Sequence, residues 1–248
     1  MKIHLFALFA TSSIACLVEK NLVAAEPPES PAPAAAIEAS PVRVPIKLLY
    51  KPPAGTGNIP TRVSGGARGE NGIDSTLFAL VPNHLALTTQ AQPSLFWFQS
   101  KPAKAKFELT VVEPKNPKPL LSLASPDADK PGIHRIKLSR YKVELQPDVA
   151  YEWSVAIIPD PDNRSKDLVA KGVIKRTKLP AELAARIESR DDAERAAAFA
   201  EAGMWYDALD AISNAIEKHP EDASLREQRA SLLKQVGLSQ AAALDTKK

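Results

Sequence analysis

Hydrophobic and polar residues alternate along several short stretches of the chain, which is the pattern of β-strands with one face in water. The clearest case is residues 106–111, where Phe107, Leu109 and Val111 alternate with polar residues. Six further strands are expected at residues 76–81, 94–99, 120–123, 133–138, 150–158 and 168–175. Seven short strands divided by Pro, Gly and Asn favour an immunoglobulin-like antiparallel β-sandwich, which we expect over residues 42–178.

The strongest local indication of a sandwich is the segment from Leu145 to Tyr151. A leucine six residues before a tyrosine at the start of a strand resembles a tyrosine corner, in which the phenol hydroxyl bonds back to the preceding backbone. Trp153, Val155 and Ile157 share the face of Tyr151 because side chains alternate along a strand. We therefore expect all four side chains in the core.

After residue 179 the spacing becomes helical. Ala196, Phe199, Ala200 and Gly203 lie at i, i+3, i+4 and i+7, so they form one stripe on one helix and Phe199 should be buried. A partner helix presents Ala208, Leu209, Ile212, Ala215 and Ile216, and ends before Pro220. Small residues at 196, 208 and 215 allow two helix axes to approach closely, and Gly203 tolerates the close contact. Ser189 followed by Asp192 resembles a capping pair at the start of the first helix.

The helical spacing recurs after 34 residues, the period of a tetratricopeptide unit. Ala196, Phe199, Gly203 and Ala208 are followed at this distance by Ala230, Leu233, Gly237 and Ala242. A third helix is expected over residues 223–236, ending at Gly237. One hairpin and a fragment are too few for an independent solenoid, so we expect a small tetratricopeptide-like helical tail, residues 179–243, docked on the sandwich. An ordinary helical hairpin is the alternative.

The N-terminus has the layout of a secretory signal: Lys2, an apolar stretch, and small residues before a cut after Ala25. Residues 1–25 are therefore expected to be a signal peptide, and the protein to be exported to the periplasm or the extracellular space. Lipidation at Cys16 is the alternative, and the apolar run is shorter than the roughly 18 residues of a transmembrane span. Residues 26–41, rich in Pro and Ala, are expected to be an extended linker.

The cysteine content excludes disulfides and thiolate metal sites from the mature chain. The chain has 248 residues, of which 44% are hydrophobic, and a single cysteine that a signal peptidase would remove. Residues 41–179 hold 21 Lys and Arg against 12 Asp and Glu, a net +9, whereas residues 180–248 hold 9 against 13, a net −4. The basic residues that could share a face are Lys101, Lys104, Lys106, Arg135, Lys137, Arg140 and Lys142. Such a face attracts an anionic polymer, lipid headgroups or an acidic partner, or it is a solvated face that attracts the acidic helical tail.

Several loop residues and titratable groups are candidates for a site. Asp160, Asp162, Asn163 and Asp167 crowd one loop, but their spacing lacks a complete calcium motif and favours a turn. Arg164 in that loop could clamp a carboxylate or anchor the loop. Neither Gly55 to Gly57 nor Gly65 to Gly69 has the context of a phosphate loop. No histidine pair has metal spacing, His134 is expected to be a core histidine, and no nucleophile motif is present, although a carboxylate pair could still form in space.

The chain resembles the cyanobacterial secreted family called domain of unknown function 928, and the resemblance spans most of the mature sequence. Its landmarks are Gly65-Gly66-Ala67-Arg68-Gly69, Thr76-Leu-Phe-Ala-Leu-Val-Pro82, Pro93-Ser94-Leu95-Phe96-Trp97-Phe98, Tyr151-Glu152-Trp153, Asp160-Pro161-Asp162-Asn163-Arg164-Ser165 and Ala202-Gly203-Met204-Trp205-Tyr206-Asp207-Ala208-Leu209. The resemblance implies an exported protein with no assigned activity. Relatives often carry cysteines near the Gly-Arg segment and before the Asp-Pro loop, where this chain has none and has Pro159.

Together these patterns predict an exported, non-enzymatic interaction protein that binds another envelope component, a protein, through its helical tail and sandwich surface. The residues expected to contact a partner are Trp205, Tyr206, Arg164 and Arg68. One alternative is binding of an anionic envelope polysaccharide through the basic face and an exposed aromatic residue such as Trp97; another is a carboxylate-based hydrolase. No cofactor, nucleic acid or transmembrane segment is expected, and the oligomeric state is left open.

Overall fold

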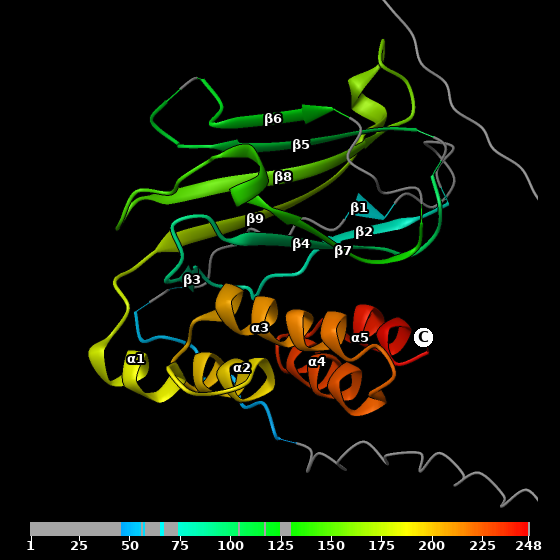
Figure 1. Cartoon of the computed structure of the whole chain (residues 1–248). Coiled ribbons are helices and arrows are strands. Elements are labelled where there is room, and N and C mark those ends of the chain that lie inside the picture. The colour runs from blue at the N-terminus through cyan, green and yellow to red at the C-terminus, as the bar shows by residue number, and fades with distance from the viewer. Residues whose placement is uncertain are drawn as a thin grey trace, which may run out of the picture. The chain divides into compact units, whose positions relative to one another are not determined.

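Two β-sheets form two layers in the computed structural model, which describes residues 46–55, 57, 65–66, 74–103, 105–116, 118–124 and 130–247 (Figure 1). One sheet is antiparallel, with the strand order β1 (Gly65–Gly66), β2 (Thr76–Ala79), β4 (Ser94–Gln99) and β7 (Gly132–Lys137). The other has the order β3 (Ala86–Thr88), β9 (Leu168–Arg176), β8 (Ala150–Ile158), β5 (Lys106–Val112) and β6 (Leu121–Ala124). Its pairs are antiparallel except for β3 with β9, which is parallel. The two sheets thus form a β-sandwich.

Burial along the strands confirms the alternation seen in the sequence. Along β5, Phe107, Leu109 and Val111 are buried and their neighbours are not. All seven expected strands are present, with bounds within two residues of the expectation. Strand β4 differs, because all six of its residues are buried. Its second face lies against helix α3 (Trp205–Lys218), so neither of its sides reaches water.

The tyrosine corner is present. The backbone N–H of Gln146 donates a hydrogen bond to the phenol oxygen of Tyr151 at 3.2 Å. Tyr151, Trp153, Val155 and Ile157 are all buried in the core, as the alternation along β8 predicts. The corner therefore ties the start of β8 to the segment that precedes it.

Five helices follow the sandwich in the described part of the chain: α1 (Ala181–Ile187), α2 (Asp192–Glu201), α3, α4 (Ala223–Gln235) and α5 (Ser239–Asp245). The 34-residue spacing is a structural repeat. Gly203 and Gly237 both end a helix with positive φ, 77° and 76°, a conformation that glycine adopts without strain. The apolar members of the repeat are buried in both copies: Ala196 and Ala230, Phe199 and Leu233, Ala208 and Ala242.

Two details of the helical region differ from the expectation. The cap of α2 is not formed by Ser189 and Asp192; Asp191 accepts from the backbone N–H of Glu194, and the Glu194 side chain accepts from that of Asp191. Helix α5 completes the second hairpin, which the sequence had suggested was only a fragment. The buried ion pair of Arg229 with Asp245, at 2.5 and 2.7 Å, joins α4 to α5.

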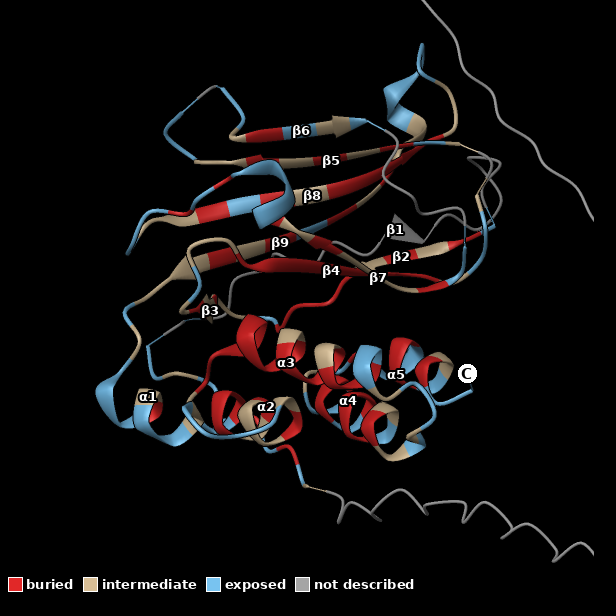
Figure 2. Cartoon of the chain, viewed as in Figure 1, coloured by how far each residue is buried: buried red, intermediate tan, exposed pale blue. Residues whose placement is uncertain are grey.

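The helices dock on the sandwich and share its hydrophobic core, so the part of the chain described from residue 46 onward is one compact unit. Helix α3 contacts β3 and β4, and α5 contacts β7. In Figure 2 the side of α3 that faces the sheet is buried. The expectation of a docked tail is confirmed. None of the described helices has the length and hydropathy needed to cross a bilayer, and the predicted signal peptide and linker lie outside the described residues.

Candidate functional site

A polar pocket of about 160 Å³ lies where the sandwich meets α3. Its walls come from the β3–β4 connection, from β7 and the turn after it, and from the first three turns of α3. The lining residues are Thr88, Gln90, Gln92, Pro93, Ser94, Arg135, Lys137, Ser139, Tyr206, Asp207, Asp210 and Asn214. Amides, hydroxyls and charges of both signs therefore surround a small volume at the junction of the two parts.

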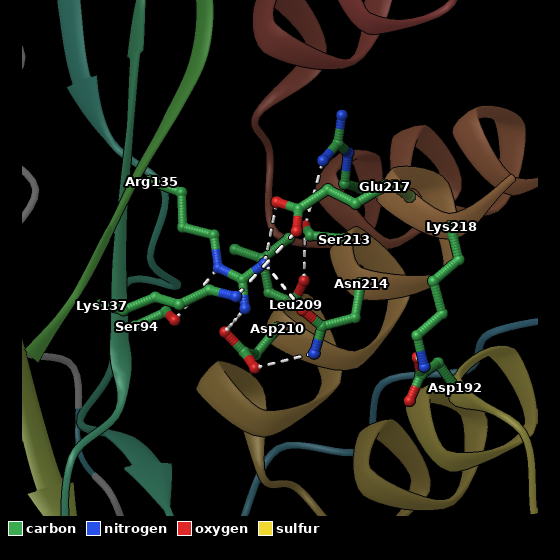
Figure 3. Close-up of polar contacts among 11 residues, drawn as sticks. Ser94, Arg135, Lys137, Asp192, Leu209, Asp210, Ser213, Asn214, Glu217 and Lys218 are labelled. Atoms are coloured by element: carbon green, nitrogen blue, oxygen red, sulfur yellow. Dashed lines mark hydrogen bonds and ion pairs between the residues drawn. The ribbon is translucent and has the colours of Figure 1, made fainter. Parts of the chain in front are cut away.

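Arg135 is the hub of this junction (Figure 3). Its Nε donates to Ser94 Oγ at 3.1 Å, and its Nη1 donates to Asn214 Oδ1 at 2.8 Å and to Glu217 Oε1 at 3.1 Å. Its Nη2 forms an ion pair with Asp210. The three acceptors on α3 are spaced i, i+4 and i+7, so one helix face presents them all. The guanidinium also lies over the ring of Phe96, 5.5 Å from its centroid.

The two cationic side chains of β7, Arg135 and Lys137, thus pair with acidic side chains of α3 in the same chain. The side chain of Arg135 is only 11% exposed, and Lys137 lies 3.9 Å from Glu217. The sequence left two roles open for the basic residues: binding an external anionic partner, or attracting the acidic helical tail. For Arg135 and Lys137 the second role is confirmed. Lys101 instead forms an ion pair with Asp74, and Lys104 lies outside the described residues.

A buried carboxylate, Asp207, fastens α3 to the chain that follows β3. Its Oδ2 accepts from the backbone N–H of Thr89 at 2.9 Å, and its Oδ1 accepts from the Thr89 hydroxyl at 2.7 Å. Burial raises the pKa of Asp207, and the hydrogen bonds from Thr89 oppose that rise. The pocket places this carboxyl in one wall with Asp210, so it does bring two carboxylates together. Both are held by donors of the chain itself.

Beside the pocket, the 3-10 turn η1 (Leu138–Tyr141) projects an aromatic ring into solvent. Leu138 anchors the turn in the core, and its N–H donates to Pro93 O at 3.0 Å. Tyr141 is 41% exposed, and its neighbours Arg140 and Lys142 are exposed as well. We call residues 139–142 the Tyr141 turn. Its Ser139 also lines the pocket, so the two features are continuous.

Sequence reasoning did not single out Tyr141, although it placed Arg140 and Lys142 on a basic face. The available signal was an aromatic residue between two cations directly after a strand. Trp97, which was expected to be an exposed aromatic residue, is 2% exposed and stacks on His134 with ring centroids 5.4 Å apart. His134 itself is half-buried and lies 2.6 Å from Lys130 O through Nε2. Among the aromatic residues that the structure describes in the sandwich, Tyr141 is the exposed one.

Two of the residues expected to contact a partner are inside the molecule. Trp205 and Tyr206 are 0% and 1% exposed. The indole nitrogen of Trp205 donates to Leu80 O at 2.8 Å, and the hydroxyl of Tyr206 donates to Val173 O at 3.1 Å. They serve the contact between helices and sandwich, so an external partner does not reach them. Sequence alone could not show this, because the covering strands lie far away in the chain.

Arg164 lies on the surface, but its guanidinium already pairs with two carboxylates of the same chain. Its Nε donates to Asp167 Oδ2 at 2.6 Å and its Nη2 to Glu108 Oε2 at 3.0 Å. These hydrogen bonds, that with Asp167 first, raise the pKa of Arg164. Asp160 pairs with Lys166, and within the described residues no three acidic, His or Cys side chains gather as a metal ion requires. Arg68 lies outside the described residues.

These features define a class: a β-sandwich with a docked pair of helical hairpins and a polar pocket at the junction. The chain belongs to the family described as Domain of Unknown Function (DUF928), whose model matches residues 63–245. A comparison with curated proteins gave no significant match. Among solved structures, the crystal structure of a multi-domain immunophilin from Arabidopsis thaliana is 8% identical, with 70% of this chain and 94% of that chain covered and a TM-score of 0.21. A similarity this low carries no inference.

Proposed function

We propose that this protein is an exported, non-enzymatic binding protein, and that its ligand is an anionic polysaccharide of the cell envelope, bound at the Tyr141 turn. The observation that carries the proposal is the exposure of Tyr141 between two exposed cations. Export rests on the signal layout of residues 1–25. The lack of a nucleophile motif and the engagement of Asp207 by Thr89 support a binding role over hydrolysis.

The chemistry of the turn suits a charged sugar. A tyrosine ring offers an apolar face to the C–H face of a pyranose and a hydroxyl to its oxygens. Arg140 and Lys142, with Glu144 opposing, give the turn an excess of positive charge. The adjoining pocket adds the amides of Gln90 and Gln92 and the hydroxyl of Ser139. A uronate-type unit would therefore find stacking, charge and hydrogen bonds on one surface.

We further infer that the sandwich is immunoglobulin-like and the helices tetratricopeptide-like. Support for the first comes from the strand orders β2-β4-β7 and β9-β8-β5-β6, and from the tyrosine corner. Support for the second comes from the repeated helix-ending glycines 34 residues apart. A fold does not by itself define a function, so the binding role rests on the Tyr141 turn.

The test is a binding titration of the full chain with a uronate polysaccharide and, in parallel, with a neutral glucan. We expect binding of the charged polymer only, weakening as salt rises. Tyr141→Ala should lower the affinity roughly tenfold, equal to about 1.4 kcal/mol. The double variant Arg140→Ala, Lys142→Ala should abolish the salt dependence. Lys115→Ala, Lys118→Ala removes the same charge from the exposed β5–β6 turn and is the matched control. Equal affinities for all variants would refute the proposal.

A partner protein is the second candidate, and one observation favours it. Leu49 is 50% exposed, and it lines a groove of about 240 Å³ beside α1 and α2. The other lining residues are Lys47, Arg186, Arg190, Glu194, Ala197, Ala198 and Glu201. A photo-crosslinking residue at position 49 should capture one envelope protein that the same residue at position 115 does not. Identical products from both positions would argue against this candidate.

A further inference from the structure

An extended segment, residues 46–53, lies along the helices before the chain enters the sandwich; we call it the arm (Figure 1). Its side chains alternate between the interior and the solvent. Leu48 and Tyr50 are 1% and 7% exposed, whereas Leu49 is 50% exposed and Lys47 is exposed. The arm therefore binds the helices in one register, through every second side chain.

The helices hold the arm by its main chain. The Gln235 side chain, at the end of α4, donates from Nε2 to Leu48 O at 2.8 Å and accepts at Oε1 from the N–H of Tyr50 at 2.9 Å. Near the end of α2, Ala200 O accepts from the N–H of Lys51 at 3.1 Å. One amide that brackets a residue in this way recognises an extended backbone, as a neighbouring strand would.

The inserted side chain of Tyr50 contacts two aromatic residues of the molecule. The ring of Tyr50 meets Trp205 edge-on at 5.0 Å between centroids, and its hydroxyl lies 3.3 Å from His84 Nε2. Gly203 lets the arm approach: a Cβ there would lie 2.8 Å from Pro53 Cγ and 2.9 Å from Lys51 O. The close contact expected of Gly203 is therefore made with the arm. Lys51 Nζ completes the set with an ion pair to Glu201 at 2.8 Å.

These contacts have the composition of a peptide complex: main-chain bonds, two inserted side chains and one terminal charge pair. We propose that the surface formed by Ala200, Gly203, Trp205, Gln235 and His84 is a binding site for an extended peptide of the pattern Leu-x-Tyr-Lys, and that the arm of a second copy of this chain binds there in trans. The arm of the same chain fills the site in the structure, at the high effective concentration that covalent connection gives.

A second copy is the occupant because its arm reproduces each of these contacts without any new surface. Exchange of an identical element between copies loses no contact at the site and alters only the connection, here residues 54–64 between the arm and the first strand of the sandwich, β1. Two copies can then fill both sites reciprocally, which closes the assembly as a dimer.

The test uses a full-length receiver variant, Leu48→Ala with Tyr50→Ala, whose own arm no longer fills the site. A fluorescent peptide of residues 46–53 should bind this receiver at least tenfold more tightly than it binds the native chain. A peptide with Lys47→Ser and Leu49→Ser is the matched control and should bind as well as the native peptide, because those side chains face outward. A peptide with Leu48→Ser and Tyr50→Ser should not bind. A folded receiver that binds none of the three overturns the proposal.

The second copy is tested by mixing the receiver with a full-length Gln235→Ala donor. The donor has a native arm but lacks the Gln235 hydrogen bonds that hold this arm in its own site. We expect light scattering to give a one-to-one complex from the mixture and monomers from each variant alone. Peptide binding without that complex would overturn the assignment to a second copy. Should the receiver not fold, the native chain is refolded at low and at high concentration; a dimer fraction that does not rise with concentration contradicts the proposal.

Discussion

The indole nitrogen of Trp153 donates a hydrogen bond to the phenol oxygen of Tyr206 at 2.8 Å, across the contact between the sandwich and helix α3. The same phenol group donates to Val173 O at 3.1 Å. Both rings are buried, and a Cβ at Gly172 would lie 2.6 Å from the indole nitrogen of Trp153. The glycine on β9 thus makes room for the ring whose polar atom reaches the helix. Trp153 belongs to a family landmark of the sandwich and Tyr206 to one of the helical region, so the two landmarks are in direct contact here.

Replacing Tyr206 by Phe is expected to lower the free energy of unfolding by about 2 kcal/mol, because a buried donor and a buried acceptor lose their partner while the apolar packing is kept. Urea denaturation followed by tryptophan fluorescence measures the change. Tyr141→Phe is the matched control, since that hydroxyl is on the surface, and its effect should stay within about 0.5 kcal/mol. Equal stabilities of the two variants would show that the Trp153–Tyr206 bond contributes nothing.

Replacing Tyr151 by Phe is expected to destabilise the sandwich by about 1 kcal/mol, since the N–H of Gln146 then lacks its acceptor. The local signature is sharper than the global one. Amide hydrogen exchange at Gln146 should quicken in the variant. Exchange of amides at the middle of β5 should change only as much as the overall stability changes. Unchanged exchange at Gln146 would mean that the tyrosine corner does not hold this amide.

Much of the fold could be predicted from the sequence because each strand carries its own alternation. In strand β5, Phe107, Leu109 and Val111 face inward and the residues between them face outward, so the local sequence is enough to predict which side chains are buried. Strand β3 could not be predicted in this way. It has three residues and owes its pairing to β9, which lies more than 80 positions away in the chain. Helices α1 and α5, with seven residues each, likewise depend on packing against their neighbours.

The site could be predicted less well, since exposure is a property of the assembled chain. Trp205 and Tyr206 begin a helix, where an aromatic pair is as consistent with a partner surface as with a core. In the folded chain both are buried, and the carbonyl groups of Leu80, just after β2, and of Val173 on β9 accept their hydrogen bonds. Tyr141 shows the reverse: the two cations beside it were a signal for an exposed position, but the exposure of its ring also depends on the burial of Leu138, which anchors the turn.

A double-mutant cycle on Arg135 and Asp210 is expected to give a coupling free energy of about 1–2 kcal/mol, because these side chains are only 11% and 27% exposed. The matched pair is Arg190 with Glu194, at 3.7 Å and 49% and 40% exposed, for which about 0.3 kcal/mol is expected. Urea denaturation at low and high salt gives both values. The coupling at Arg135 should persist in salt; a coupling as small as that of the exposed pair would contradict a structural role for the junction.

Asp207 should make stability depend on pH in a direction opposite to that of most carboxylates. Burial raises its pKa in the folded chain above the ordinary 3.8. Below pH 3.8 the carboxyl is protonated in both the folded and the unfolded chain, and its ionisation costs nothing. As the pH rises above 3.8 the unfolded chain releases the proton first, so the unfolded state is favoured until the raised folded pKa is passed.

The measurement compares the native chain with Asp207→Asn, which cannot ionise, in urea denaturation from pH 3.5 upward. The native chain should lose stability relative to the variant as the pH rises, because all other titrating groups cancel in the difference. Thr89→Val removes the hydroxyl that donates to Asp207 Oδ1, so it should raise the folded pKa further and extend the loss to higher pH. A difference between the native chain and Asp207→Asn that stays constant with pH would show that the two hydrogen bonds from Thr89 fully offset the burial of the carboxylate.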